Sequence, residues 1–313
     1  MYKYILKRLL LMIPIVLGVS IIIFFLISIV PGDPATIILQ GNATAEDVAR
    51  LNHELGYDLP IIVRYFNYMK ALILHGDFGK SYVSGLPVLQ ELLSKAPISA
   101  MVAMNAIVFA SVIGVPLGVL SAVKQYSLAD KVPTFFALVF SSAPAFWIGL
   151  MLMQLFSLKL GLLPTGGIET LKSYILPMLT LGTPYAAEQL RFTRSSMLET
   201  IRQDYIRTAR AKGAKESRVI WKHAMRNALL PVITVSGVNF GALMGGAVVT
   251  ETLFSLPGIA SYIVNGIKQK DVPVVMGGII FFAIVFAFVM LLVDLIYAFV
   301  DPRIKAKYSG RRN

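Results

Sequence analysis

Long apolar runs alternate with short polar segments along this chain of 313 residues. Residues 9–30 contain no charged side chain, and about 20 apolar residues in a helix cross the hydrocarbon core of a bilayer. The same pattern predicts five further spans, at residues 98–123, 132–158, 174–190, 230–253 and 274–300. We therefore expect an all-α integral membrane protein with six transmembrane helices.

The fourth run is the least regular of the six. Pro177 and Pro184 interrupt it, and Glu188 lies near its end. Prolines are tolerated inside a span when neighbouring helices satisfy the backbone groups that proline frees. Residues 174–190 are counted as a span on that ground.

Lys and Arg are distributed unevenly around these spans. With a cytoplasmic N-terminus, the segments on the inner side carry 20 of the 29 basic residues. An excess of Lys and Arg is typical of cytoplasmic loops. Because an odd number of spans would destroy this asymmetry, we expect six spans and two cytoplasmic termini.

The polar segments divide the chain into four parts. These are the cytoplasmic N-terminus with the first span (1–30), an extracytoplasmic helical insertion (31–96), a domain of five spans with a cytoplasmic loop at 191–229 (97–302), and a basic cytoplasmic tail (303–313).

The insertion carries clear helix signals. Thr44 is expected to cap a helix that stops at Gly56, and Pro60 to open a second helix at 61–74. A third helix is expected at 87–95. Residues 61–74 are apolar but too few to cross a bilayer, so they predict a surface helix.

Composition excludes several kinds of chemistry. The chain is 56% hydrophobic and 15% charged, and it contains no cysteine. Disulfides, thiolate catalysis and Cys-ligated metals are therefore excluded. His53, His75 and His223 lie far apart in the sequence. We expect no catalytic residue, no metal site and no bound cofactor in this chain.

A nucleotide-binding motif is only partly present at Gly79-Lys80-Ser81. The phosphate-binding loop needs a glycine five residues before Gly79, and that position is Leu74. The expected topology also places the segment outside the cell. The chain is therefore expected to bring no ATPase of its own.

The longest cytoplasmic loop combines basic residues with two helical patterns. One mostly apolar stripe is predicted before a stop at Gly213, because apolar and small residues recur at helical spacing: Met197, Ile201, Tyr205, Thr208/Ala209 and Lys212. A second helix is expected from about Ser217, with a stripe at Val219/Ile220, Ala224 and Ala228.

Three partners for this loop can be weighed. The spacing of Ala209, Gly213 and Val219 and the net charge of +12 invite a nucleic-acid interpretation. A loop tethered to the membrane at both ends would struggle to enter a groove about 8.5 Å deep, and its charge is what cytoplasmic sorting produces. If the segment were a helix on the membrane surface, contact with anionic lipid would explain the arginines. Docking into a groove on another protein would also explain why two helices meet at a glycine in this loop.

Residues 204–231, "DYIRTARAKGAKESRVIWKHAMRNALLP", resemble the cytoplasmic coupling segment of permease subunits from the dipeptide/oligopeptide branch of ABC-type importers. The general motif is E-A-A-x-x-x-G followed by I-x-L-P after nine residues. Ala209 and Gly213 match it, whereas Arg207 and Thr208 replace the acid and the first alanine. Leu230-Pro231 lies five residues beyond the general spacing, and the role of the acid is not carried over to Arg207.

Other segments resemble the same branch in the same order. They are "IVPGDPA" (29–35), "GDFGKSY" (76–82), "SSAPAFWIGL" (141–150), "ETLFSLPGIA" (251–260) and "DPR" (301–303), so that the resemblance covers residues 1–306.

The resemblance implies a type I ABC importer permease fold in a bacterial or archaeal cytoplasmic membrane. Such a subunit pairs with a sibling permease, contacts membrane lipid but no nucleic acid, and receives cargo from an extracytoplasmic substrate-binding protein. Two cytoplasmic ATPase subunits would bind ATP and Mg. Di- and oligopeptides are the implied cargo, with nickel chelates or glutathione as alternatives. The implied ATPase-coupling residues are Asp204, Tyr205, Arg207, Thr208, Ala209, Arg210, Ala211, Lys212, Gly213 and Ala214.

Small and polar residues in the spans are further candidates. Gly237, Gly241 and Gly245 are four apart, which predicts a helix-packing seam, with pore gating as the alternative. Five polar residues at membrane depth either line a substrate path or form hydrogen bonds between helices: Asn105, Gln154, Ser236, Asn239 and Thr250.

Ionisable residues inside spans are functional hypotheses by default. Glu251 lies at the outer end of the fifth span and is expected to hold an external gate loop at 254–260, which includes Pro257. Asp294 lies closer to the inner face. The competing class is a self-sufficient secondary transporter or channel, which is expected to show an internal repeat and midplane charges. The sequence shows no clear repeat.

Overall fold

The computed structural model describes residues 2–29, 34–39 and 44–300. Nearly all of these residues are helical, and in the described part the only β feature is an isolated antiparallel bridge between Lys80 and Pro87. The predicted all-α class is confirmed. The basic tail expected at 303–313 lies outside the described residues.

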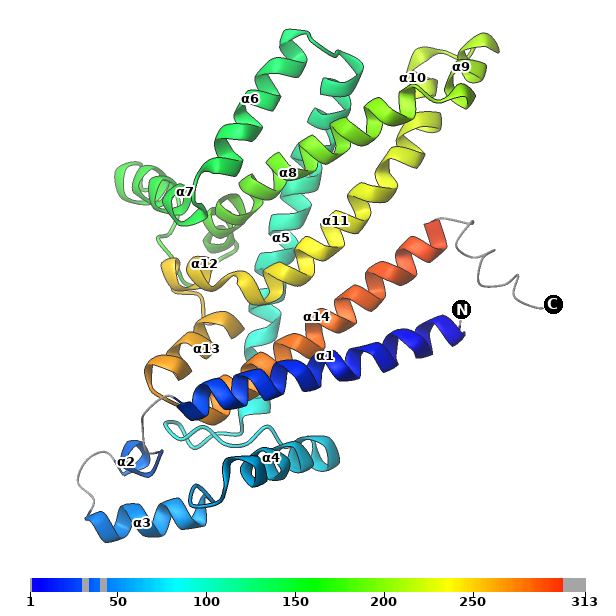
Figure 1. Ribbon diagram of the computed structural model, residues 1–313. Helices are drawn as coiled ribbons and strands as arrows, with labels where there is room; N and C mark the ends of the chain where they lie inside the picture. Colours follow the sequence, from blue (N-terminus) through cyan, green and yellow to red (C-terminus); the bar gives the residue numbers. More distant parts are fainter. Residues whose placement is uncertain (1, 30–33, 40–43, 301–313) are drawn as a thin grey trace, which may run out of the picture. The chain divides into compact units, whose positions relative to one another are not determined.

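The helices group into two compact units (Figure 1). The smaller unit comprises Leu6–Ser99 and Pro257–Ala287. It holds most of α1 (Tyr2–Ile29), the helices α2 (Pro34–Ile38), α3 (Ala45–Glu54), α4 (Ile61–His75) and α13 (Ile259–Lys268), and the first parts of α5 (Val88–Val123) and α14 (Val272–Val300).

The larger unit contains residues 2–5, Ala100–Leu256 and residues 288–300 of the described chain. Besides the rest of α5 and α14, its helices are α6 (Leu128–Ser142), α7 (Ala145–Leu152), η1 (Met153–Lys159), η2 (Leu171–Tyr174), α8 (Ile175–Ile201), α9 (Asp204–Ala211), α10 (Glu216–Arg218), η3 (Val219–Ala224), α11 (Met225–Gly246) and α12 (Val248–Leu253).

Four helical stretches in the described part are long and apolar enough to cross a membrane: Leu9–Ile29, Val88–Val123, Glu216–Met244 and Val272–Leu295. A fifth results if the bent pair Leu128–Ser142 and Ala145–Lys159 counts as one span. The first, second and sixth predicted spans correspond to three of these stretches. The count of six is not confirmed.

The third predicted span, 132–158, is not one straight helix. The helix breaks after Ser142, and the two halves are bent by 102°. Ala143 and Pro144 both have extended backbone, with ψ of 133° and 132°. Proline lacks an N–H and pushes the residue before it out of the helical region. The break therefore follows from Pro144.

The fourth predicted span lies within α8, which is not among the apolar stretches. With 27 residues α8 is about 40 Å long, enough to cross a bilayer. Glu188, Gln189 and Arg191 interrupt its apolar sequence. Length thus allows a span at α8, but composition does not establish one.

Two predicted boundaries are corrected by the structure. The third insertion helix and the second span form one helix, α5, of 36 residues, so the boundary at 96/97 falls inside it. The fifth predicted span, 230–253, ends earlier. α11 stops at Gly246, and Val248–Leu253 form the separate helix α12.

Helix starts and stops in the smaller unit follow the sequence signals. The Thr44 side chain accepts a hydrogen bond from the Asp47 backbone N–H, and the Asp47 carboxylate accepts one from the Thr44 N–H. This reciprocal capping box starts α3. Pro60 precedes α4, as expected, and Gly56 lies beyond the end of α3 with a φ of 70°.

The core of the smaller unit is aromatic and aliphatic. Phe24 of α1 meets Tyr65 of α4 edge to face, with 5.3 Å between the ring centroids. The Tyr65 hydroxyl also lies 2.9 Å from the hydroxyl of the buried Ser20. Val88 and Ile280 are fully buried in the same cluster. These contacts fix α1 against α4 within the unit.

The segment that resembled a phosphate-binding loop is a structural turn. The Ser81 hydroxyl donates to the buried Asp271 carboxylate at 2.5 Å, and the Tyr82 N–H donates to the same carboxylate at 3.1 Å. Gly79 has a φ of 84° and lies against Pro273, a backbone conformation that glycine adopts without a steric penalty. Ser81 therefore anchors the turn to the start of α14.

Candidate functional site

The predicted cytoplasmic loop folds as two helices around a glycine turn. α9 (Asp204–Ala211) ends just before the turn, and α10 (Glu216–Arg218) follows it. Gly213 has a φ of 74°, in the left-handed region that glycine favours. A Cβ added at Gly213 would meet no atom within 4 Å. The expected glycine turn is confirmed, and it is constrained by backbone conformation alone.

An ion pair closes the turn from outside. Arg210 Nε lies 3.0 Å from one carboxylate oxygen of Glu216, and Arg210 Nη2 lies 2.6 Å from the other. This two-pronged geometry is the stronger form of an Arg–carboxylate contact. Both side chains are exposed, so the pair contributes at most about 1 kcal/mol.

A hydrophobic cluster backs the two helices. Ile206 of α9 and Val219 of η3 are fully buried, together with Met197 of α8. Val119 and Ala122 of α5 join the same cluster. The helix–turn–helix segment (residues 204–218) is thus packed onto the ends of two long helices and does not project freely.

The predicted stripe through this segment is partly wrong. α8 ends at Ile201, and Gln203 has extended backbone before α9 begins. The break shifts the helical register, so Ile206 is buried and Tyr205 is 43% exposed. Tyr205 accepts a hydrogen bond of 2.7 Å from the Asn227 side chain. The predicted second stripe is confirmed at Val219, Ile220, Ala224 and Ala228, all of which are buried.

Most of the candidate coupling residues lie on an outward face. Ala209 and Ala214 are the exceptions, because they are half-buried and pack against the backing cluster. The exposed positions are Asp204, Tyr205, Arg207, Thr208, Arg210, Ala211, Lys212 and Gly213. We call these eight residues the outward face of the segment.

Two polar contacts join α8 to α11. The Asn239 amide donates to the Glu188 carboxylate at 2.7 Å, and the Gln189 amide donates to the Ser236 hydroxyl at 3.0 Å. Gln189 is fully buried, whereas Glu188 and Asn239 are half-buried. Ser236 and Asn239, two of the predicted polar candidates, are therefore brought together against the same helix. Glu188 was not predicted as a site residue, although an acidic residue inside a predicted span is a signal that could have found it.

The other polar candidates lie apart from this pair. Asn105 is half-buried on α5, Gln154 is exposed on η1, and Thr250 is buried on α12. No hydrogen bond joins any two of them among the described residues. Of the five predicted polar candidates, the structure therefore brings together Ser236 and Asn239, at the α8–α11 contact.

The glycine seam of α11 has one clear partner within the larger unit. A Cβ at Gly237 would collide with both methyl groups of Val293 on α14. Gly241 is buried, and Gly245 lies in the same helix. The close approach at Gly237 is what a packing seam requires.

The predicted gate residues lie at a unit boundary. Glu251 is fully buried in α12, and its carbonyl oxygen accepts a hydrogen bond of 2.7 Å from the Leu256 N–H. Phe254 is also fully buried, and its carbonyl accepts a bond from the Gly167 N–H at 3.0 Å. The chain passes into the smaller unit at Pro257, which is exposed.

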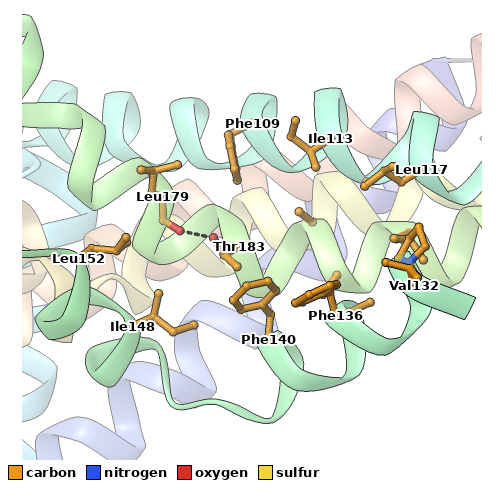
Figure 2. A pocket seen from close by; sticks show the side chains of 16 residues that line it. Phe109, Ile113, Leu117, Val132, Phe136, Phe140, Ile148, Leu152, Leu179 and Thr183 are labelled. Atoms are coloured by element: carbon orange, nitrogen blue, oxygen red, sulfur yellow. Dashed lines mark hydrogen bonds between the residues drawn. The ribbon is translucent and has the colours of Figure 1, made fainter. Parts of the chain in front are cut away.

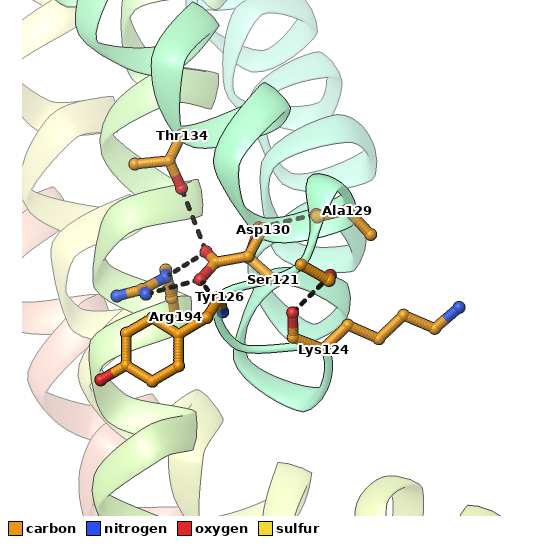
Figure 3. A network of polar contacts seen from close by, with 8 residues as sticks. Ser121, Lys124, Tyr126, Ala129, Asp130, Thr134 and Arg194 are labelled. Atoms are coloured by element: carbon orange, nitrogen blue, oxygen red, sulfur yellow. Dashed lines mark hydrogen bonds and ion pairs between the residues drawn. The ribbon is translucent and has the colours of Figure 1, made fainter.

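A second polar cluster, which the sequence did not reveal, ties α6 to α8 (Figure 3). Arg194 donates to both oxygens of Asp130, at 2.7 and 2.9 Å. The Tyr126 N–H and the Thr134 hydroxyl add bonds of 2.9 and 3.3 Å to the same carboxylate. Asp130 and Arg194 are 64 positions apart, so no local pattern predicts their pairing.

An apolar cavity of about 450 Å³ lies between α5, α6, α7 and α8 (Figure 2). Phe109, Phe136 and Phe140 point into it. The one side-chain hydroxyl among the lining residues belongs to Thr183, and it already donates a hydrogen bond of 2.6 Å to the Leu179 carbonyl oxygen. Burying a polar group without a hydrogen bond is costly, so this cavity is unsuited to polar ligands.

Sequence comparison identifies two matching families. Residues 114–306 match the family described as "Binding-protein-dependent transport system inner membrane component". Residues 1–103 match the corresponding N-terminal family, "Binding-prot-dependent transport system membrane comp, N-term". Together the two matches cover nearly the whole chain.

Curated relatives are similar over their full length. The chain is 40% identical to the glutathione transport system permease protein GsiC of Salmonella choleraesuis (strain SC-B67), over 98% of this chain and 100% of the relative. It is 41% identical to the dipeptide transport system permease protein DppB of Alkalihalophilus pseudofirmus, over 97% and 100% of the two chains.

The fold also has a solved neighbour. A chain from inward-facing structures of the MetNI methionine ABC transporter aligns with a TM-score of 0.54 at 19% identity, over 68% of this chain and 97% of the neighbour. This likeness concerns the fold alone. The family matches and the relatives show that the chain belongs to the binding-protein-dependent transport system inner membrane components, the permeases of ABC importers.

Proposed function

We propose that this chain pairs with a sibling permease to form the path for di- and oligopeptides across the cytoplasmic membrane. Relatives named for dipeptide and for glutathione are about equally similar to it. Glutathione is itself a small peptide, so peptide cargo accommodates both names. Glutathione remains the second candidate cargo, and a nickel chelate the third.

The proposed topology has six spans, with both termini in the cytoplasm. Four or five spans are supported by length and composition, and α8 supplies the sixth. A span that lines a polar path is expected to carry polar residues on one face. The Glu188–Asn239 contact is consistent with that role for α8.

The observation that carries the coupling proposal is the outward face of the helix–turn–helix segment. Eight of the ten candidate coupling residues are exposed there, while Ile206 and Val219 anchor the segment from behind. A short amphipathic helix with a fixed base suits insertion into a groove on a partner protein. The proposed partners are two cytoplasmic ATPase subunits, which bind ATP and Mg.

Long helices provide a route for coupling. Met197 in the backing cluster and Glu188 at the polar contact belong to the same helix, α8. The cluster also includes Ala228 of α11, the helix that carries Asn239. A displacement of the segment would therefore reach the polar contact through two continuous helices. Such coupling requires two states for which the ATPases differ in affinity.

The proposed path includes the α8–α11 polar pair, with Asn105, Gln154 and Thr250 as further candidates. Glu188 would supply a carboxylate to a cationic cargo group such as a peptide ammonium. The apolar cavity of Figure 2 is not part of this path, because it offers peptide groups no free hydrogen-bonding partner.

Reconstitution tests the proposed function. The chain would be placed in liposomes with its sibling permease, the ATPases and the binding protein, and uptake of labelled dipeptide would be measured. We expect uptake that requires ATP and the binding protein. Uptake by this chain alone, driven by an ion gradient, would contradict the proposal and favour a secondary transporter.

A further inference from the structure

The smaller unit contains a cavity of about 230 Å³ that the proposed transport path does not use. Its lining comes from the outer part of α1, the connection between α3 and α4, α4 itself and the beginning of α14. The lining combines apolar side chains with Arg64, Asn67 and Tyr68. Such a mixture of apolar walls and a few convergent polar groups is typical of ligand sites.

Arg64 is held in place by aromatic rings and has no counter-charge nearby. Its guanidinium carbon lies 3.7 Å from the centre of the Tyr57 ring and 5.9 Å from that of Phe24. Among the described residues, no carboxylate lies within 4 Å of it and no hydrogen bond engages it. This cation–π contact holds the guanidinium over the Tyr57 ring and leaves its N–H donors available.

Tyr68 offers a second unused donor. Its hydroxyl oxygen is inaccessible to solvent and has no hydrogen-bond partner in the described part of the chain. Burial raises the pKa of Tyr68 above its usual value, so the hydroxyl keeps its proton. A buried hydroxyl without a partner costs free energy, which a ligand oxygen would remove.

The acidic residues around the cavity already have donors. Asp271 accepts hydrogen bonds from the Ser81 hydroxyl and the Tyr82 N–H. Asp77, whose charge also raises the pKa of Tyr68, accepts a bond of 2.8 Å from the Gly79 N–H. The Tyr57 and Tyr82 hydroxyls bond to each other at 2.9 Å. Among the residues that line this cavity, Arg64, Asn67 and Tyr68 are therefore the side chains whose donors have no hydrogen-bond partner in the described part of the chain.

We propose that this cavity binds an oxyanion, a carboxylate or a phosphate, through the guanidinium edge of Arg64 and the hydroxyl of Tyr68. A planar guanidinium pairs two N–H donors with two oxygens of such a group. The cavity is smaller than the 300–1,000 Å³ common for drug-sized ligands, so it takes the anionic group and a few attached atoms. The source is either a phospholipid headgroup or a small soluble anion.

The test measures binding at the site itself. The full chain in a neutral detergent would be titrated with inorganic phosphate, sodium acetate or dihexanoyl phosphatidylglycerol, with chloride keeping the ionic strength constant. Hydrogen–deuterium exchange of residues 55–82 reports occupancy. We expect at least one probe to protect this segment. Protection by phosphatidylglycerol alone identifies a lipid headgroup, and protection by phosphate or acetate identifies a soluble anion.

Variants connect the signal to the named donors. Arg64→Gln should raise the dissociation constant of the anion at least about tenfold, as expected for loss of a charge-assisted pair. Lys70→Gln removes the same charge from an exposed position of α4 and should leave binding unchanged. Absence of protection by every probe, or equal binding by Arg64→Gln and wild type, would overturn the proposal.

A milder variant covers the case in which Arg64→Gln does not fold. Tyr68→Phe removes a single oxygen and retains the ring. It should raise the dissociation constant of the anion about threefold or more, as expected for the loss of one hydrogen bond. A dissociation constant equal to that of wild type in a folded Tyr68→Phe protein would also overturn the proposal.

Discussion

Arg194 of α8 holds Asp130 of α6 through two parallel hydrogen bonds, 2.7 and 2.9 Å long. The Asp130 side chain is 6% exposed and that of Arg194 is 26% exposed, so the pair is largely removed from solvent. Arg194 lies one helical turn before Met197, which enters the cluster behind the helix–turn–helix segment. The pair therefore fixes the beginning of α6 to the part of α8 that supports this segment.

Removing the charge of Asp130 should destabilise the protein. Asp130→Asn leaves the Arg194 guanidinium without its counter-ion, and breaking such a pair costs about 2–4 kcal/mol. A drop in the thermal midpoint of the full chain in detergent measures this loss. Arg191→Gln is the control, because Arg191 is exposed and bonds to the Ser141 hydroxyl. Equal losses in the two variants would contradict the anchoring role.

Gly237 should not tolerate a side chain while Val293 remains opposite. A Cβ at position 237 would overlap both Val293 methyl groups, and overpacking typically costs about 1–3 kcal/mol. Gly237→Ala should lower the thermal midpoint, and adding Val293→Ala should restore part of it. A double variant whose loss equals the sum of the losses of the two single variants would show that the two positions do not oppose each other.

The start of α3 should depend on pH. Hydrogen bonds from the Thr44 side chain and backbone hold the pKa of Asp47 below its usual value. A carboxylate with a depressed folded pKa stabilises the helix above its unfolded pKa, and this stabilisation is lost as pH falls through the folded pKa. Hydrogen exchange in residues 45–54 should therefore accelerate, beyond its intrinsic pH dependence, when pH falls below about 4. Asp47→Asn should remove this dependence, and an unchanged profile would contradict the prediction.

The turn at Gly213 should depend on the backbone conformation that the residue can adopt and not on the size of its side chain. With no atom within 4 Å of an added Cβ and a φ of 74°, a β-branched residue meets backbone strain of about 1–2 kcal/mol or more. Gly213→Val should uncouple ATP hydrolysis from uptake in the reconstituted importer. Gly213→Asn should retain coupling, because Asn tolerates the left-handed region. Coupled uptake by Gly213→Val at the level of Gly213→Asn and wild type would show that the turn geometry is not required.

Local signals in the sequence predicted local structure well. Thr44, Pro60 and Gly213 each act through their own backbone or nearest neighbours, and all three lie at the expected helix ends. Pro144 was equally local, yet its apolar surroundings concealed the break between α6 and α7. Mean hydropathy depends on the composition of a window of residues, so it does not detect that Pro144 lacks a backbone N–H.

Long-range polar pairs could not be predicted from the chain. Asp130 with Arg194 and Glu188 with Asn239 join residues that are distant in sequence, and their partners depend on how the helices pack. A break of two residues after Ile201 similarly moved the buried position from Tyr205 to Ile206. Candidate residue types were recognisable in the sequence, whereas their pairing and orientation required the fold.

The central claim, that the outward face docks on an ATPase, is tested most directly by cross-linking. Because the chain contains no cysteine, Arg207→Cys or Lys212→Cys gives a benzophenone-maleimide reagent one attachment site on this subunit. Leu171→Cys is the control, since Leu171 is 80% exposed in a loop expected on the opposite side of the membrane. In the assembled importer, we predict a light-induced adduct with the ATPase from positions 207 and 212 and none from position 171. An ATPase adduct from neither position of the outward face, or only from the control, would contradict the claim.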